Sequence, residues 1–158
     1  MPIHLSFIAR SIQLLYMKAT DVIRRDHKAA LELINKYKNA SQEEREEMTA
    51  QIFDALDTHE MMEDTKFYTA LEDVVEDNAA LAELVEEQAE LTETMSRIKA
   101  MEGVEQTDAL ADALDTVVAH AQKEEKEILP LAEKALGEEQ LNEIGEEMEP
   151  ISAVALVG

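Results

Sequence analysis

The scarcity of helix-breaking residues limits what this chain can fold into. Only four glycines and three prolines occur in 158 residues, so long stretches of the chain contain neither. These stretches are rich in Ala, Leu, Glu and Met, which all favour helices. The sequence therefore predicts an all-α protein.

Helix-breaking and capping residues divide the chain into four long predicted helices and a short fifth one. Ser41 forms a capping box with Glu44, three residues later. We expect Gly103 to end the third helix, Thr107 to cap the fourth and Gly137 to end the fourth. The expected helices span about residues 20–38, 41–76, 78–101, 107–137 and 138–148. Because the connections are short, we expect an antiparallel up-down four-helix bundle with a short C-terminal fifth helix.

The two ends of the chain differ from the predicted bundle, which spans residues 17–149. Residues 1–16 contain an apolar run that Arg10 interrupts, too short to cross a bilayer and without the cleavage pattern of a secretory signal. We expect this N-terminal extension to be an extra amphipathic helix or sequence outside the working domain, and the protein to be cytoplasmic. Residues 150–158 form an apolar tail, which we expect to fold back or to dock on a partner as a peptide.

Composition limits the possible ligands. Apolar residues make up 46% of the chain, enough for one domain to bury a core without disulfides or a structural metal. The net charge of −22 opposes binding to nucleic acid and to anionic membranes. Because the chain has no cysteine, metal ligands must come from His, Asp, Glu and neutral oxygen donors, which suit iron or manganese better than structural zinc.

Three of the four histidines lie on predicted inward faces of separate helices. His27 lies four residues after Ile23 and shares its helix face. His59 and His120 each lie four residues before a glutamate, so each of these two histidines shares a helix face with its glutamate. The apolar residues that define these faces are Ile23, Ala30, Leu31 and Ile34; Phe53, Leu56, Phe67, Ala70 and Leu71; and Val117, Ile128 and Leu131. Burying unpaired carboxylates costs several kcal/mol, so two inward acids that face imidazoles indicate a bound cation.

The order of these motifs is more specific than either motif alone. An Asp-His pair at residues 26–27 is followed by HEMMEDTKFYT at 59–69 and HAQKEEKEILP at 120–130. From about Met17 to Met148 this pattern resembles the hemerythrin-like HHE cation-binding family. The resemblance implies two carboxylate-bridged iron ions in a non-haem di-iron centre, with Glu63 and Glu124 as the bridges. The iron ligands that it implies are His27, His59, Glu63, His120 and Glu124.

Two further acids stay open as ligands under this resemblance. Oxygen-carrying members of the family place the last carboxylate five residues after its histidine, which makes Glu125 a competitor of Glu124. The helical face favours Glu124. Glu60 matches a further carboxylate ligand of an iron-sensing relative.

The third predicted helix departs from the family pattern because it has no histidine. Gln88 stands where the family's first histidine is expected, and Glu87 beside it is a possible carboxylate substitute. The inner stripe of this helix contains Leu81, Leu84, Val85, Gln88, Leu91 and Met95. Because an amide oxygen binds iron more weakly than an imidazole does, one metal would keep open positions.

The resemblance implies a protein that binds or senses oxygen, a related diatomic molecule, peroxide or iron. The open site on the third helix favours an alternative, a di-iron enzyme that degrades peroxide or activates oxygen. We expect Met61 and Met62 to fill the core and Tyr68 to pack beside Phe67, with a redox role for Tyr68 as the alternative. With 4% aromatic residues, the sequence offers no identifiable pocket for a large organic substrate.

Overall fold

The computed structural model describes residues 17–152, and every regular element in that range is a helix. This confirms the predicted all-α class. The predicted N-terminal extension and residues 153–158 of the predicted tail lie outside the described range. Among the described helices, none is long and apolar enough to cross a membrane.

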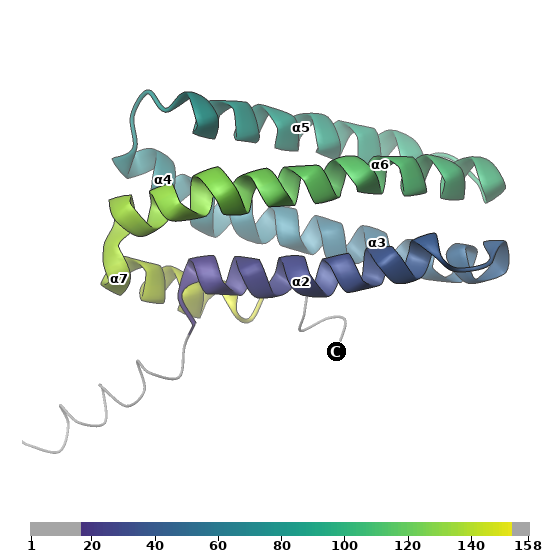
Figure 1. Cartoon of the computed structure of the whole chain (residues 1–158), viewed down its shortest axis with the longest axis horizontal. Coiled ribbons are helices and arrows are strands. Elements are labelled where there is room, and N and C mark those ends of the chain that lie inside the picture. The colour runs from purple at the N-terminus through teal and green to yellow at the C-terminus, as the bar shows by residue number, and fades with distance from the viewer. Residues whose placement is uncertain (1–16, 153–158) are drawn as a thin grey trace, which may run out of the picture.

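Four long helices run back and forth beside one another (Figure 1). They are α2 (Ala19–Lys38), α3 (Gln42–Met62), α5 (Ala79–Lys99) and α6 (Gly103–Lys123). Two of them continue into π-helical segments followed by further α-helix. These continuations are η1 (Glu63–Tyr68) with α4 (Thr69–Val74), and η2 (Glu124–Ile128) with α7 (Leu129–Met148). Helix α7 packs against α2.

Local caps fix two of the helix starts, and the one at Ser41 is the capping box that the sequence predicts. Ser41 accepts a hydrogen bond from the Glu44 amide at 3.3 Å, and the Glu44 carboxylate accepts one from the Ser41 amide at 2.8 Å. The side chain of Asn78 caps α5 by accepting from the Leu81 amide at 3.0 Å. These bonds satisfy backbone donors that have no partner inside a helix.

The predicted cap at Thr107 is wrong. Helix α6 begins four residues earlier, at Gly103, whose positive φ of 59° permits the tight turn before the helix. Thr107 is buried inside the helix, where its hydroxyl donates to the Gln42 side chain at 3.0 Å. A local capping pattern at Thr107 is thus overridden by a tertiary hydrogen bond.

The chain beyond α6 also divides differently from the prediction. Helix α7 runs as one element from Leu129 to Met148, and no separate short fifth helix is assigned within the described residues. The expected break at Gly137 is present as a departure from helical geometry, with φ of 74° and ψ of 168°. Pro130 lies in the first turn of α7, directly after the π-helical segment η2.

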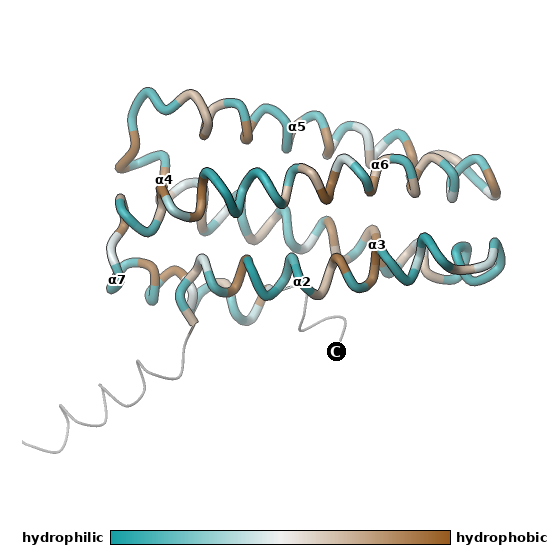
Figure 2. Tube along the Cα trace, in the orientation of Figure 1, coloured by the Kyte–Doolittle hydropathy of each residue, from teal (hydrophilic) through white to brown (hydrophobic). Residues whose placement is uncertain are grey.

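The apolar core has two parts, and each helix alternates apolar and polar residues along its length (Figure 2). The first apolar cluster, near α4 and α7, includes Ile23, Met62, Phe67, Leu71, Ile128 and Leu129. The second apolar cluster, toward the opposite ends of α2 and α3, includes Ile34, Tyr37, Ile52, Met95, Leu110 and Leu114. Between the two clusters lie three histidines, His27 on α2, His59 on α3 and His120 on α6. The polar residues therefore occupy the level at which the apolar core is interrupted.

Three apolar residues expected to face inward are largely exposed. The exposed fractions are 42% for Leu31, 37% for Val85 and 51% for Met61. Val85 and Met61 each adjoin a fully buried residue, so the helical rotation of about 100° per residue turns them outward. Leu31 borders a cavity, so no neighbouring side chain covers it.

Gly145 provides a test of how α7 packs on the segment that leads into α2. A Cβ atom added at Gly145 would lie 1.9 Å from the carbonyl oxygen of Met17 and 2.9 Å from the backbone nitrogen of Ala19. Gly145→Ala normally favours a helix, but here we expect a loss of at least about 2 kcal/mol in unfolding free energy. Chemical denaturation measures this loss, with Glu146→Ala at the next, exposed position as the control. A stabilised Gly145→Ala variant would contradict the packing.

Candidate metal centre

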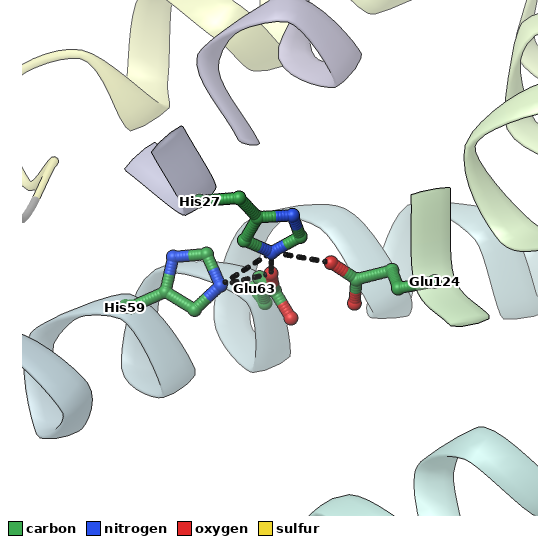
Figure 3. A group of neighbouring side chains, drawn as sticks. All are labelled: His27, His59, Glu63 and Glu124. Carbon is green, nitrogen blue, oxygen red and sulfur yellow. Dashed lines mark hydrogen bonds and ion pairs between the residues drawn. The ribbon is translucent and has the colours of Figure 1, made fainter. Parts of the chain in front are cut away.

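Four side chains from three parts of the chain converge inside the helices (Figure 3). The Nε2 atom of His27 lies 3.1 Å from Oε1 of Glu124 and 3.2 Å from Nε2 of His59. The Nε2 atom of His59 lies 2.5 Å from Oε1 of Glu63. One donor atom from each of these residues lies within 4.8 Å of all the others, a spacing that suits a shared metal ion. We call His27, His59, Glu63 and Glu124 the central cluster.

The two glutamates of the central cluster are buried without adequate partners. Glu63 and Glu124 are each 1% exposed. Oε1 of each glutamate makes no well-aligned hydrogen bond among the described residues and instead faces the ring nitrogen of His27 or His59. Buried carboxylate oxygens without partners are costly, and a cation placed among them would remove that cost. The imidazole and carboxylate donors therefore fit a metal ion, and a set without thiolate suits iron or manganese.

The charges of the central cluster shift the pKa values of its members. Burial opposes the charged form of His27, but hydrogen bonds with Glu124 and Glu63 raise its pKa to about 9. Burial opposes the charged form of His59 as well, and the charge of Glu63 raises its pKa well above 6.5. Burial and the charge of Glu63 raise the pKa of Glu124 to about 7. Without a metal, the cluster therefore holds protons at neutral pH that a cation would displace.

Both glutamates of the central cluster begin π-helical segments. Glu63 is the first residue of η1 and Glu124 the first residue of η2, and each lies four residues after its histidine. Widened turns of this kind are rare and occur frequently at functional sites. The sequence pattern gave no sign of them, because one widened turn does not change the spacing of the apolar residues enough to be recognised.

His120 lies outside the central cluster but lines the same cavity. Its Nε2 atom is 3.3 Å from Oε1 of Gln88, and its Nδ1 atom is 3.4 Å from Oε2 of Glu87. Gln88 is buried and donates through Nε2 to Asp64 at 2.7 Å, which directs its amide oxygen toward His120. Glu87 is also held by Lys123, at 2.8 Å. The predicted third-helix residues thus do lie beside His120.

The remaining predicted acids have other partners. Glu60 lines the cavity and accepts a hydrogen bond from the Thr92 hydroxyl at 3.0 Å. Glu125 lies on the other side of the His27 ring, with Oε1 3.5 Å from Nδ1, and its side chain is 39% exposed. Glu124, and not Glu125, is the member of the central cluster.

Asp26 and Ser152 lie behind the site and were not identified from the sequence as site residues. Asp26 is buried, and its Oδ2 atom lies 3.8 Å from Nδ1 of His59. Its Oδ1 atom accepts from the buried Ser152 hydroxyl at 2.6 Å, and Arg25 donates to the same hydroxyl at 3.1 Å. A carboxylate behind an imidazole fixes the ring so that its other nitrogen faces the metal. Asp26 precedes His27 in the sequence, but only the fold brings it to His59.

Tyr68 combines packing with a polar contact. Its ring packs edge-on against Phe67, with centroids 5.3 Å apart, as the sequence predicts. Its hydroxyl donates a hydrogen bond to Oε2 of Glu124. Burial and the charge of Glu124 raise the pKa of Tyr68, so the hydroxyl keeps its proton and remains a donor. Tyr68 therefore holds one carboxylate of the central cluster in place.

Comparison with known proteins gives one family. The family model described as the hemerythrin HHE cation binding domain matches residues 18–132. The matched range contains all four residues of the central cluster and His120. Comparisons with curated proteins and with solved structures give no match.

The pKa shifts predict opposite pH dependences for the fold and for metal binding. The raised pKa of His27 stabilises the metal-free fold below about pH 6.5, and this contribution is lost as the pH rises through about 9. The raised pKa of Glu124 acts in the same direction up to about 7. We expect the unfolding free energy of the metal-free protein to fall by on the order of a few kcal/mol as the pH rises from about 6.5 to about 9. Metal affinity should rise over the same range, because the histidines lose their protons.

Thermal unfolding of the metal-free protein and metal titration at matched pH values measure the two trends. Changes of the same sign in both measurements would contradict the assignment of shared protons to the central cluster.

Asp26→Asn tests the support of His59. The variant replaces the carboxylate behind His59 by an amide, and we expect metal affinity to fall by roughly 10- to 100-fold. Asp21→Asn changes an exposed acid on the same helix and is the matched control. Thermal unfolding of the metal-free variant separates loss of metal from loss of fold. Metal affinity equal to that of the unmodified protein would show that Asp26 does not position His59.

Proposed function

The chain belongs to the hemerythrin HHE cation-binding family, and from this premise we propose that it holds a non-haem di-iron centre. The centre would bind or sense oxygen, a related diatomic molecule, peroxide or iron. When bound, iron would supply coordination of the small molecule and exchange of electrons with it. The residues of the chain hold the ions, set the charge around them and limit access of water.

The observation that carries this proposal is the pair of buried glutamates in the central cluster. Glu63 and Glu124 come from different helices, and among the described residues each has a buried oxygen without a well-aligned hydrogen bond. His27 and His59 lie on one side of this pair. Without a metal, protonated His27 and His59 face these oxygens and balance the charge of the carboxylates. Metal ions bound by both glutamates would balance the same charge and leave His27 and His59 neutral as ligands.

The second metal position would be poorer in imidazole than the first. His27 and His59 serve the first position, whereas His120 is the histidine near the second. The negative charge of Glu63 acts on both His59 and His120, which agrees with a carboxylate between the two positions. Gln88 offers an amide oxygen at the second position, and Glu87 offers a carboxylate if Lys123 releases it.

This difference in ligands between the two proposed metal positions favours the second candidate function, a di-iron enzyme that degrades peroxide or activates oxygen. Open positions at one ion allow a substrate to bind directly, since Gln88 is a weak ligand. Tyr68 donates a hydrogen bond from its buried hydroxyl to Glu124, one of the two proposed bridging carboxylates. Reversible carriage of oxygen, in contrast, requires two iron ions of which only one has a vacant coordination position.

Metal content of the bridging-residue variants tests the proposed centre. We expect two iron ions for each unmodified chain, and Glu63→Ala and Glu124→Ala should each lose at least one ion while keeping their helix content. Glu125→Ala is the matched control, because its carboxylate lies outside the central cluster and half in solvent. Metal content and circular dichroism measure these outcomes. Two ions retained in both variants, or lost only from Glu125→Ala, would show the bridging assignment to be wrong.

The optical spectrum of the reduced, iron-loaded protein separates the two functions. A stoichiometric spectral change on exposure to oxygen that reverses on its removal supports binding or sensing. Continued consumption of peroxide or oxygen, with no lasting spectral change, supports the enzyme. A chain that binds no iron supports neither.

A further inference from the structure

The cavity that contains the candidate metal centre extends well beyond it. Its volume is about 290 Å³, and residues of α2, α3, α5 and α6 line it. A diatomic molecule needs only a small part of this space, since even a water molecule in the liquid occupies about 30 Å³. Pockets that hold small organic ligands begin at about 300 Å³. The cavity is therefore sized for an organic molecule, which the low aromatic content did not lead us to expect.

The two ends of this cavity differ in polarity. At one end lie the central cluster residues His27 and His59 together with His120 and Gln88. The walls beyond them are aliphatic, formed by Ile34, Ile52, Leu56, Leu91, Met95 and Val117. The lining beyond the metal centre is mainly apolar, and the cavity is also bordered by the charged residues Arg24, Asp26, Lys28, Glu60 and Glu125. A ligand that matches the cavity is polar at one end and aliphatic along the rest.

Small side chains leave the aliphatic part open. Ala30 on α2, Ala55 on α3 and Ala121 on α6 face the cavity from three sides. A larger apolar residue at any of these positions would fill part of the space. The opening at Leu31 also reaches the surface, which accounts for its exposure and gives a ligand a path inward.

We propose that this cavity binds a medium-chain aliphatic carboxylic acid, with its carboxylate at the metal centre and its alkyl chain against Ile52, Leu91 and Met95. The inference rests on the proposed function, because the positive charge that attracts the carboxylate comes from the metal ions. Two divalent ions carry more charge than Glu63 and Glu124 neutralise, and the neutral Gln88 adds none. In the metal-free chain, protonated His27 and His59 balance these two glutamates, so the central cluster offers an anion little net charge.

The length of the cavity sets the length of the chain. Ile52 precedes His59 by seven residues on α3, which corresponds to about 10 Å along the helix. An extended chain of about eight carbon atoms with bonds of roughly 1.5 Å covers this distance. Octanoate is therefore the probe of choice, and acetate is its headgroup without the chain.

Calorimetric titration of the iron-loaded, full-length chain with octanoate and acetate tests the proposal. Each buried methylene group is worth roughly a fourfold gain in affinity, so octanoate should bind at least about a hundredfold more tightly than acetate. Octylamine, which has the same chain and the opposite charge, should not bind. The metal-free chain should bind neither acid. Equal affinities for octanoate and acetate in a chain that holds iron would overturn the proposal.

Cavity-filling variants test where the alkyl chain lies. Ala55→Leu should weaken octanoate binding at least about tenfold and leave acetate binding unchanged. Ala50→Leu adds the same atoms at an exposed position of α3 and is the control. Ala30→Leu, at a half-buried position, serves if Ala55→Leu does not fold. Unchanged octanoate binding in a folded filling variant would overturn the proposal.

Iron content is measured in every sample and separates two kinds of failure. A chain that takes up no iron and binds neither acid contradicts the proposed di-iron function and, with it, this inference. A chain that takes up two irons but does not prefer octanoate contradicts this inference alone.

Discussion

The repulsion between Glu63 and Glu124 is the constraint on which the rest of the structure depends. Both carboxylates lie in the interior, and burial together with the charge of Glu63 raises the pKa of Glu124 to about 7. The two apolar clusters lie on either side of this level and pack the helices together around it. The apolar core therefore stabilises an arrangement that is unfavourable at its centre until positive charge is bound there.

Residues outside the central cluster limit how far its members can relax. Tyr68 holds Glu124 by a hydrogen bond, and the buried Asp26 carboxylate lies 3.8 Å behind the His59 ring. Glu63 and Glu124 occupy equivalent positions, since each is the first residue of a π-helical segment. Asp26 in turn depends on Ser152, which links the end of α7 to the site. Metal binding and the docking of the C-terminal turn are thus parts of one network.

Sequence reasoning succeeded where the signal is local. The capping box at Ser41, the buried faces that contain His59 and Glu63, and the choice of Glu124 over Glu125 as the inward residue all depend on positions within a turn or two of one helix. It failed where residues far away in the sequence determine the surroundings of a side chain. Thr107 is drawn into the interior by Gln42, and Asp26 meets Ser152 across 126 positions of sequence. No periodicity within one helix contains that information.

The unequal surroundings of the two proposed metal positions connect the site to the cavity. If a second imidazole stood at Gln88, it would occupy the side of the site that faces Leu91 and the aliphatic walls. Gln88 is instead held by Asp64, so its amide stays in place and leaves that side accessible. In the proposed centre, Gln88 in place of a histidine would weaken one metal position and also open it toward the apolar space. A diatomic ligand would not need this opening, whereas the organic ligand that we propose would enter through it.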